Sequence, residues 1–327
     1  ADRVKQEQRD RPKRIEFLRR CTEALFGGER NREIRAHIEQ SFMVPQWGAY
    51  HNEGMYMDTH LHTMMQQIDS MSQGIFVGAL PETYRTRWQK YARNERQFLE
   101  KYVLLHDIAK KDCLTIKYAE EEKTMTWHEW NSYIPSILQK QPDPEVLQAF
   151  LQQENVVSIS YFQKGAKHGA RSHGKVGVDF VEHSHRGSMT PLLAHAIEHH
   201  EVGYLFSTVA PATYEKYFSA LSYKERDMVL CAAYLDTTAS FGKDHRPQLS
   251  NFTYLLQSAE WFTAMQDLKI DEEIQVLLRD KKIDPLKVRQ FFDHPNVAML
   301  SARKKKKKEF IESVLPTEYQ VEALMHD

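Results

Sequence analysis

The chain has 327 residues and a formal net charge of −1, so its overall charge gives no attraction to nucleic acid or to a membrane. Hydrophobic residues make up 41% of the sequence, which allows a sizeable core and excludes global disorder. The cysteines Cys21, Cys113 and Cys231 form no CxxC pair, so neither a disulfide framework nor a zinc ribbon is expected. No apolar run reaches the roughly 20 residues that span a bilayer. We therefore expect a cytoplasmic protein that does not contact a membrane.

Apolar residues at three- and four-residue spacing predict helices along most of the chain, and hence an all-α fold. Residues 1–44 indicate two charged helices separated by Gly27-Gly28. A further helix is expected to begin with Asp58 or Thr59 as its N-cap, because short polar side chains satisfy the first free amides of a helix.

Residues 82–111 predict a long helix or a helix pair that ends at His106-Asp107. The region 112–160 is less regular, and its segment TIKYAEEEKTMTWHEW can form a short hairpin. Further helices are expected from residue 173 and over 190–206 and 223–240. The chain then divides into an N-terminal helical extension, a central domain and a charged C-terminal helical extension, over residues 1–44, 45–245 and 246–327.

Histidines and aspartates recur on the apolar faces of these helices. His106 shares a face with Leu99 and Val103, and His173 shares one with Val176 and Phe180. Asp236 and His199 lie on apolar faces in the same way. A single such histidine is more often a core residue with satisfied hydrogen bonds. A buried carboxylate, however, is costly unless it is paired or bound to a metal, and the joint pattern favours a metal. Mixed imidazole and carboxylate ligands suit iron, manganese, zinc, magnesium or nickel.

The local sequences around these residues resemble the HD-domain metallohydrolase superfamily, whose pattern is a first His, a His-Asp pair, further histidines and a final Asp. The matching segments are HDIAK (106–110), SHGKVGVDF (172–180), IEHHEVG (197–203), AAYLDTTASFG (232–242) and PQWGAYHNEGMYMDTHLHTMM (45–65). The resemblance covers roughly residues 45–245 and implies an HD-domain helical bundle.

The resemblance also implies a ligand set of one or two divalent transition metals. One metal would be held by the first His together with His106, Asp107 and Asp236, and a second by Asp107, His173 and His199. His200 would be a further ligand or a substrate contact. The first His is either His60, which has Met64 and Ile68 at +4 and +8, or His62, whose following Thr-Met-Met resembles the family's local sequence.

Other residues are candidates for substrate contact. Lys110 lies one turn after His106 and can contact a phosphate as a catalytic point charge, or it can be a solvated lysine at a helix end. Arg171, His62 and His51 are further candidates, with ordinary surface positions as the alternative. The basic stretches 3–35 and 303–308 can contact RNA, although exposed solvated faces explain them equally simply.

The resemblance implies a phosphohydrolase, a phosphomonoesterase or phosphodiesterase that attacks a nucleotide, cyclic nucleotide or RNA end with a metal-activated hydroxide. One alternative is a di-iron oxygenase, because a branch of the superfamily uses the same ligand arrangement with two irons. Another is a nucleic-acid-binding scaffold that retains the HD fold.

Overall fold

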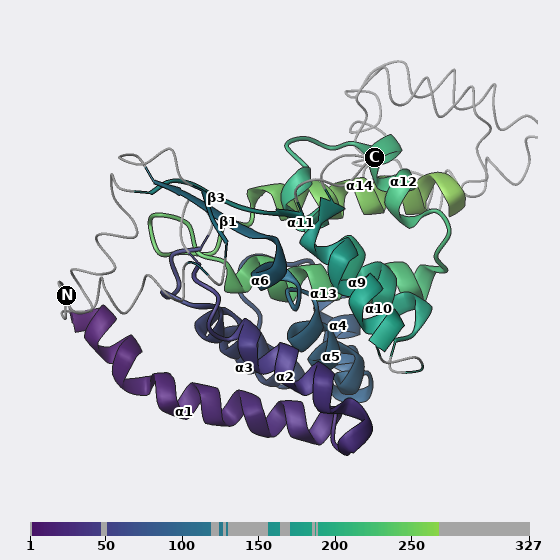
Figure 1. The fold of residues 1–327 in the computed structure, drawn as a ribbon. Coiled ribbons are helices and arrows are strands. Elements are labelled where there is room, and N and C mark those ends of the chain that lie inside the picture. Colours follow the sequence, from purple (N-terminus) through teal and green to yellow (C-terminus); the bar gives the residue numbers. More distant parts are fainter. Residues whose placement is uncertain are drawn as a thin grey trace, which may run out of the picture. The chain divides into compact units, whose positions relative to one another are not determined.

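The computed structural model describes residues 2–46, 51–118, 124–126, 129, 156–163, 171–184, 187 and 189–267. This part of the chain is mostly helical, which confirms the all-α prediction, and a small sheet is added to the helices (Figure 1). The longer helices are α1 (Asp2–Leu25), α2 (Arg32–Ser41), α3 (Met57–Ser72), α4 (Glu82–Asn94), α5 (Arg96–Leu105), α9 (His173–Ser184), α10 (Pro191–Glu198), α12 (Pro211–Phe218), α13 (Tyr223–Ala239) and α14 (Ser250–Asp267).

The two expected N-terminal helices are present as α1 and α2, with a short 3-10 turn, η1 (Glu29–Asn31), between them. The break falls at the predicted Gly27-Gly28, where Gly28 has a φ of 87°, a left-handed conformation that favours glycine. Helix α1 packs on α2, α3 and α5 and runs along one edge of the bundle (Figure 1). Its buried face includes Leu18, which is fully buried.

Helix α3 begins at Met57, and its N-cap is Tyr56, so the expectation of an Asp58 or Thr59 cap was wrong. Asp58 is instead fully buried, and its carboxylate accepts a 3.1 Å hydrogen bond from Arg14 Nε of α1. Asp58 therefore pairs with an arginine inside the protein and does not cap the helix, because a buried carboxylate needs a charged partner.

Helix α13 is the central element of the bundle and contacts α3, α4, α5 and α10. Its bounds match the predicted 223–240, and it begins with a capping box in which Ser222 and Glu225 satisfy each other's backbone amides. All its residues from Arg226 to Ala239 are buried. A helix that is buried all round belongs inside a bundle, and this placement puts Asp236 in the interior.

The predicted pair over 82–111 is α4 and α5, followed by a turn and the short α6 (Lys110–Cys113). The predicted helix over 190–206 is interrupted, because α10 ends at Glu198 and α11 (Val202–Leu205) follows a turn. That interruption decides which of two adjacent histidines points inward.

A four-stranded antiparallel sheet has the order β2-β1-β3-β4. The expected hairpin is present, since β1 (Leu114–Tyr118) pairs with β2 (Thr124–Met125). The sequence reading missed β3 (Val156–Gln163), although its apolar and serine residues alternate with the period of two that is typical of a strand. The short β4 (Arg171–Ser172) leads directly into α9 at His173, where a helix was expected to start.

Close contacts divide the chain into two units, residues 1–204 with 222–249, and residues 205–221 with 250–327. In the second unit, Tyr214 of α12 stacks on Phe218 at 4.2 Å between ring centroids and packs near Phe262 of α14. The three-part division of the chain remains a prediction. Among the described helices, none is both long enough and apolar enough to cross a membrane.

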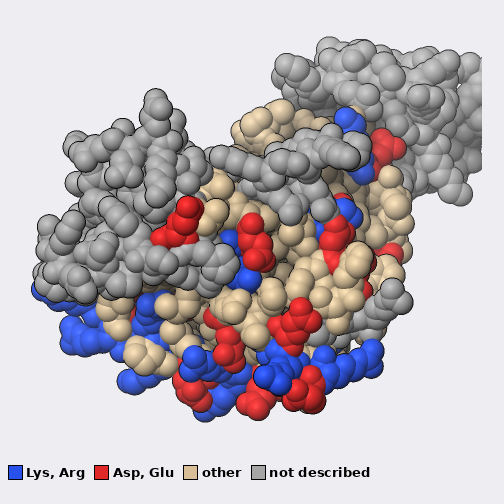
Figure 2. Space-filling model, in the orientation of Figure 1, with Lys and Arg blue, Asp and Glu red and all other residues tan. Residues whose placement is uncertain are grey.

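Basic and acidic side chains are interleaved on the face of the molecule drawn in Figure 2, including its lower edge, where α1 lies in Figure 1. On α1, Lys5, Arg9 and Lys13 are exposed, and so are Glu16 and Glu23. This mixture fits an ordinary solvated helix, so RNA contact through residues 3–35 remains a prediction. The lysine run at 303–308 and residues 268–327 as a whole lie outside the described residues.

Candidate metal centre

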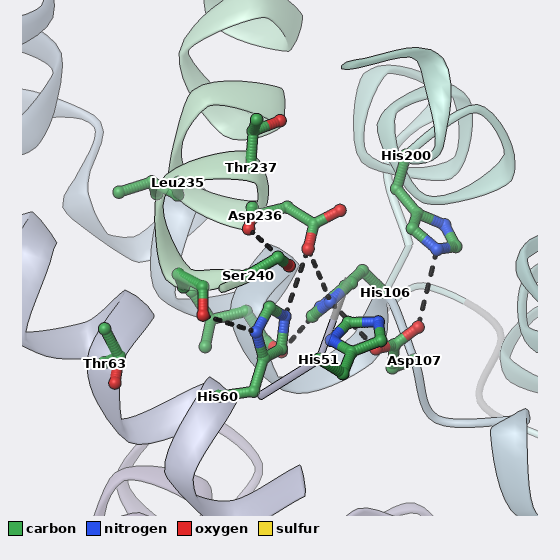
Figure 3. Close-up of polar contacts among 12 residues, drawn as sticks. His51, His60, Thr63, His106, Asp107, His200, Leu235, Asp236, Thr237 and Ser240 are labelled. Carbon is green, nitrogen blue, oxygen red and sulfur yellow. Dashed lines mark hydrogen bonds and ion pairs between the residues drawn. The ribbon is translucent and has the colours of Figure 1, made fainter. Parts of the chain in front are cut away.

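Three helices bring His60, His106 and Asp236 together in the core of the first unit (Figure 3). His60 lies in the first turn of α3, His106 directly follows α5, and Asp236 lies near the end of α13. Asp236 Oδ1 is 3.1 Å from His60 Nε2 and 3.8 Å from His106 Nε2. We call these three residues the first cluster.

A second cluster consists of Asp107, His173 and His200. Asp107 Oδ1 is 3.0 Å from His173 Nε2 and 3.4 Å from His200 Nε2, and the two imidazole Nε2 atoms are 2.9 Å apart. His173 is the first residue of α9, and His200 follows the end of α10. All three side chains are buried.

Asp107 connects the two clusters. Its Oδ1 faces the second cluster, whereas its Oδ2 is 3.2 Å from His106 Nε2 of the first. Oδ2 also lies 2.8 Å from Lys110 Nζ, which is buried and sits 4.8 Å from the ring centre of Tyr161. Adjacent residues at the end of α5 thus serve both clusters.

The four cluster histidines share one orientation. In each, Nδ1 lies within hydrogen-bond distance of a backbone carbonyl and Nε2 faces the carboxylates. The pairs are His60 with Ala239 at 3.3 Å, His106 with Val103 at 3.0 Å, His173 with Tyr161 at 3.3 Å, and His200 with Ile197 at 2.7 Å. A carbonyl only accepts, so it selects the tautomer with a proton on Nδ1 and leaves the Nε2 lone pair for another partner. The same arrangement is typical of metal-binding histidines.

The donor set passes a further test of fit to a metal. His60 Nε2, His106 Nε2 and Asp107 Oδ1 are buried yet make no hydrogen bond of acceptable geometry in the part of the chain that the structure describes. Such atoms are costly unless something satisfies them. Ligands at about 2.0–2.2 Å from one ion stand about 3–3.5 Å from each other, close to the 2.9–3.8 Å separations within both clusters.

The electrostatics of both clusters favour a cation. Burial alone would lower the pKa of His60, but the Asp236 and Glu53 carboxylates raise it to about 10. Burial likewise opposes a charge on His200, yet Asp107 raises its pKa to about 8. Burial would raise the pKa of Asp107, but His106 and Lys110 hold it well below its usual range. Burial lowers the pKa of His173, so the tendency to hold a proton is strongest at His60 and His200. The negative potential that favours a proton at these two histidines also attracts a metal cation.

The structure separates the members of two histidine pairs: His60 and His62 were alternatives for the first ligand, whereas His199 and His200 were both candidates at the second metal. His60 lies in the first cluster, whereas the half-buried His62 points toward α1, with its ring 5.3 Å from that of Phe17. His200 lies in the second cluster, and His199 belongs to neither among the described residues. Because α10 ends at Glu198, His199 leaves the helix in a different direction and packs its ring 4.7 Å from that of His195.

Of the remaining candidates for substrate contact, His51 lies near the first cluster, and the Arg171 side chain is not described. His51 is half-buried beside the first cluster, with its ring 5.5 Å from that of His60. The backbone of Arg171 lies in β4, and its side chain is outside the described residues.

The sequence reading missed two residues at this site, Glu53 and Tyr161. Glu53 is buried, and its Oε1 is 3.2 Å from His60 Nδ1. Tyr161 borders Lys110 and donates a 3.0 Å hydrogen bond to the Pro45 carbonyl. In the sequence, Glu53 could have been found from its position between His51 and Gly54 in the segment HNEG. Tyr161 could have been found by recognising the alternating pattern of β3.

Gly174, in the first turn of α9, allows the second cluster to form. A Cβ at this position would lie 2.7 Å from the Ile197 carbonyl oxygen and 3.1 Å from His200 Nδ1. The first distance is shorter than real contacts of this kind, so any larger residue would push α9 away from the end of α10. Helix α9 therefore brings His173 close to His200 only because glycine has no side chain.

Comparison of the chain with protein-family models, with curated proteins and with solved structures gave no match. What the structure establishes is a mostly helical protein with buried His/Asp clusters that can hold one or more metal ions.

Proposed function

We propose that this protein is a metal-dependent phosphohydrolase of the HD type with a two-metal site. His60, His106, Asp107 and Asp236 would hold one ion, and Asp107 with His173 and His200 would hold the other. The observation that carries the proposal is the common orientation of the four histidines toward two carboxylates, since His106, His173 and His200 face Asp107 and His60 faces Asp236. Core histidines that serve only packing have no reason to present four Nε2 lone pairs to the same two aspartates.

When bound, two divalent ions supply Lewis acidity and lower the pKa of water into the neutral range. The chain's own residues prepare the site for an anion. Lys110 places a fixed positive charge 2.8 Å from Asp107, where burial strengthens its effect on nearby phosphate oxygens. Asp107 keeps that lysine charged, since it raises the pKa of Lys110 against the lowering effect of burial.

The proposed substrate is a phosphate ester of a nucleotide, a cyclic nucleotide or an RNA end. The support is the combination of a buried cation and a divalent-metal donor set, which together suit a phosphoryl group that carries charge on several oxygens.

A di-iron oxygenase is the second candidate. It is favoured by the four imidazoles among six donors, because imidazole suits iron as well as zinc and nickel. The basis for ranking it second is Lys110, because a buried ammonium at the centre favours an anionic substrate.

Elemental analysis of protein purified without chelator tests both candidates, followed by assays for phosphate release and oxygen uptake. About two ions per chain and phosphate release without oxygen would support the phosphohydrolase. Two irons with oxygen uptake would favour the oxygenase. No metal, even after manganese or nickel is added back, would contradict both and favour the scaffold.

A further inference from the structure

Glu53 stands between two histidines of different environment. Its Oε1 is 3.0 Å from His51 Nδ1 and 3.2 Å from His60 Nδ1. Its other oxygen, Oε2, accepts a 3.1 Å hydrogen bond from the Phe241 amide, just after α13. A buried carboxylate is thus fixed by the backbone at one oxygen and offers the other to two imidazoles.

The two histidines differ in exposure. The His60 side chain is fully buried in the first cluster, whereas 17% of the His51 side chain is exposed. His51 is the most exposed of the five histidines around the two clusters. Among these histidines, His51 is therefore the one that solvent reaches most readily.

We infer that Glu53 is a positioning residue that orients His60 toward the metal and His51 toward the substrate through one shared carboxylate oxygen. A carboxylate accepts and does not donate, so both imidazoles must carry their protons on Nδ1. His60 then presents Nε2 to the cation, and His51 presents Nε2 to the substrate side as a proton acceptor. The inference deepens the proposed function and rests on it for the role of the metal.

His51, Glu53 and His60 also have the spacing of a small metal site of their own. The hydrogen bonds argue against that use. His60 Nδ1 already lies 3.3 Å from the Ala239 carbonyl, which requires a proton on that nitrogen, while its Nε2 is the atom without a hydrogen bond. An ion at Nδ1 would need a doubly deprotonated His60 that bridges two metals.

The backbone around Glu53 is built to hold it in place. The Asn52 amide donates to the Phe241 carbonyl at 3.0 Å, and the Gln46 amide donates to the Met55 carbonyl at 2.9 Å. Gly54 packs so closely against Thr59 that a Cβ there would overlap the threonine side chain. The segment is therefore tied to α3 on one side and to the end of α13 on the other, which supply His60 and Asp236.

The test compares Glu53→Gln, which keeps the shape and removes the charge, with Glu53→Ala, which removes the acceptor. The matched control is Glu7→Gln. Glu7 is also a partly buried carboxylate that anchors the same segment, since its Oε1 accepts from the Met55 amide at 3.2 Å and from Thr59 Oγ1 at 3.3 Å. Manganese or zinc affinity is measured by competition with a chelating dye, and ¹⁵N-histidine NMR of the chelator-treated protein reports which nitrogen of His51 carries the proton.

We expect both Glu53 variants to lose about 10–100-fold in metal affinity, the usual effect of removing a partner of a metal-binding histidine. In the wild type, His51 should carry its proton on Nδ1, and Glu53→Ala should move a detectable fraction to Nε2. Glu7→Gln should change neither quantity. His51→Gln and His60→Gln assign the two signals.

Wild-type affinity in both Glu53 variants would overturn the inference, and so would a wild-type His51 protonated on Nε2 alone. A third ion per chain that disappears in Glu53→Gln would show a metal site in place of a positioning residue. If the wild type binds no metal at all, the proposed function fails, while the His51 proton still shows separately whether Glu53 orients that ring.

Discussion

Two buried aspartates on the same helix, Asp227 and Asp236, have different kinds of partner. Asp227, on α13, receives hydrogen bonds from three side chains of α4: Arg87 at 2.7 and 3.1 Å, Trp88 at 3.0 Å and Tyr91 at 2.9 Å. Asp236, two and a half turns further along the same helix, faces the Nε2 atoms of His60 and His106, and neither makes a hydrogen bond of acceptable geometry among the described residues. Both aspartates are buried.

The difference shows how a structural carboxylate can be told from a ligand. Around Asp227 the Arg87, Trp88 and Tyr91 side chains all donate hydrogen bonds to the carboxylate, and together they compensate the cost of its burial without a metal. Around Asp236 and Asp107 most partners are imidazoles, which can exchange a proton for a metal, and Lys110 is a further partner of Asp107 at 2.8 Å. Burial alone therefore does not mark a site, and the nature of the partners does.

The largest expected effect comes from removing the carboxylate shared by the two clusters. Asp107→Asn should abolish binding of the second ion and lower turnover about 1,000-fold, because metal assistance is worth several kcal/mol in the transition state. Elemental analysis and phosphate release measure the two losses, with circular dichroism as the check on folding. The control is the exposed neighbour Asp112→Asn, and full metal content in Asp107→Asn would refute the site.

Removing the Asp227 carboxylate should lower the stability of the fold and leave metal binding intact. Asp227→Ala leaves Arg87, Trp88 and Tyr91 without their acceptor and should cost about 3 kcal/mol of unfolding free energy, the lower end for a broken buried pair because Arg87 is partly exposed. Urea denaturation gives the value. Metal affinity should stay unchanged, and Asp69→Ala, which breaks the exposed pair with Arg96, should cost under about 1 kcal/mol. A drop in metal affinity would erase the distinction between the two sites.

The adjacent residues His199 and His200 allow the same comparison between a ligand and a residue outside the clusters. His200→Ala should weaken binding of the second ion by at least about 10–100-fold, since it removes a ligand that faces Asp107. His199→Ala should leave that affinity within about 2-fold, because its ring packs on His195 outside the clusters. Titration of manganese followed by electron paramagnetic resonance distinguishes the two variants. Equal effects would mean that the turn after α10 adopts another conformation.

The smallest expected effect concerns Lys110. Lys110→Met should lower turnover about 10-fold, a loss of about 1.4 kcal/mol of transition-state stabilisation, while both ions stay bound. Steady-state kinetics on a nucleotide substrate gives the ratio. Lys111→Met is the control, because Lys111 is a buried lysine of the same helix that pairs with Asp112 at 2.9 Å and not with Asp107. An unchanged rate in Lys110→Met would reduce this lysine to a structural partner of Asp107.

Helix phase was a sound guide where a helix is regular. It placed His106, His173 and Asp236 on interior faces, and the structure buries all three. The prediction that His199 faces the interior failed, because the spacing of apolar residues does not show that α10 ends at Glu198. The turn after α10 directs His200, and not His199, toward Asp107. The cap of α3 failed for a different reason, since Asp58 finds Arg14 of α1, a partner 44 positions away that local preference cannot reveal.

If both clusters bind a metal as proposed, the number of bound ions depends on the absence of a side chain at Gly174. A glycine codon becomes an alanine codon by one nucleotide change, and the added methyl group would wedge α9 away from the Ile197 carbonyl. The first cluster does not involve α9 and would survive. On the proposed assignment, one point mutation in the gene would therefore convert a two-ion protein into a one-ion protein without replacing a ligand.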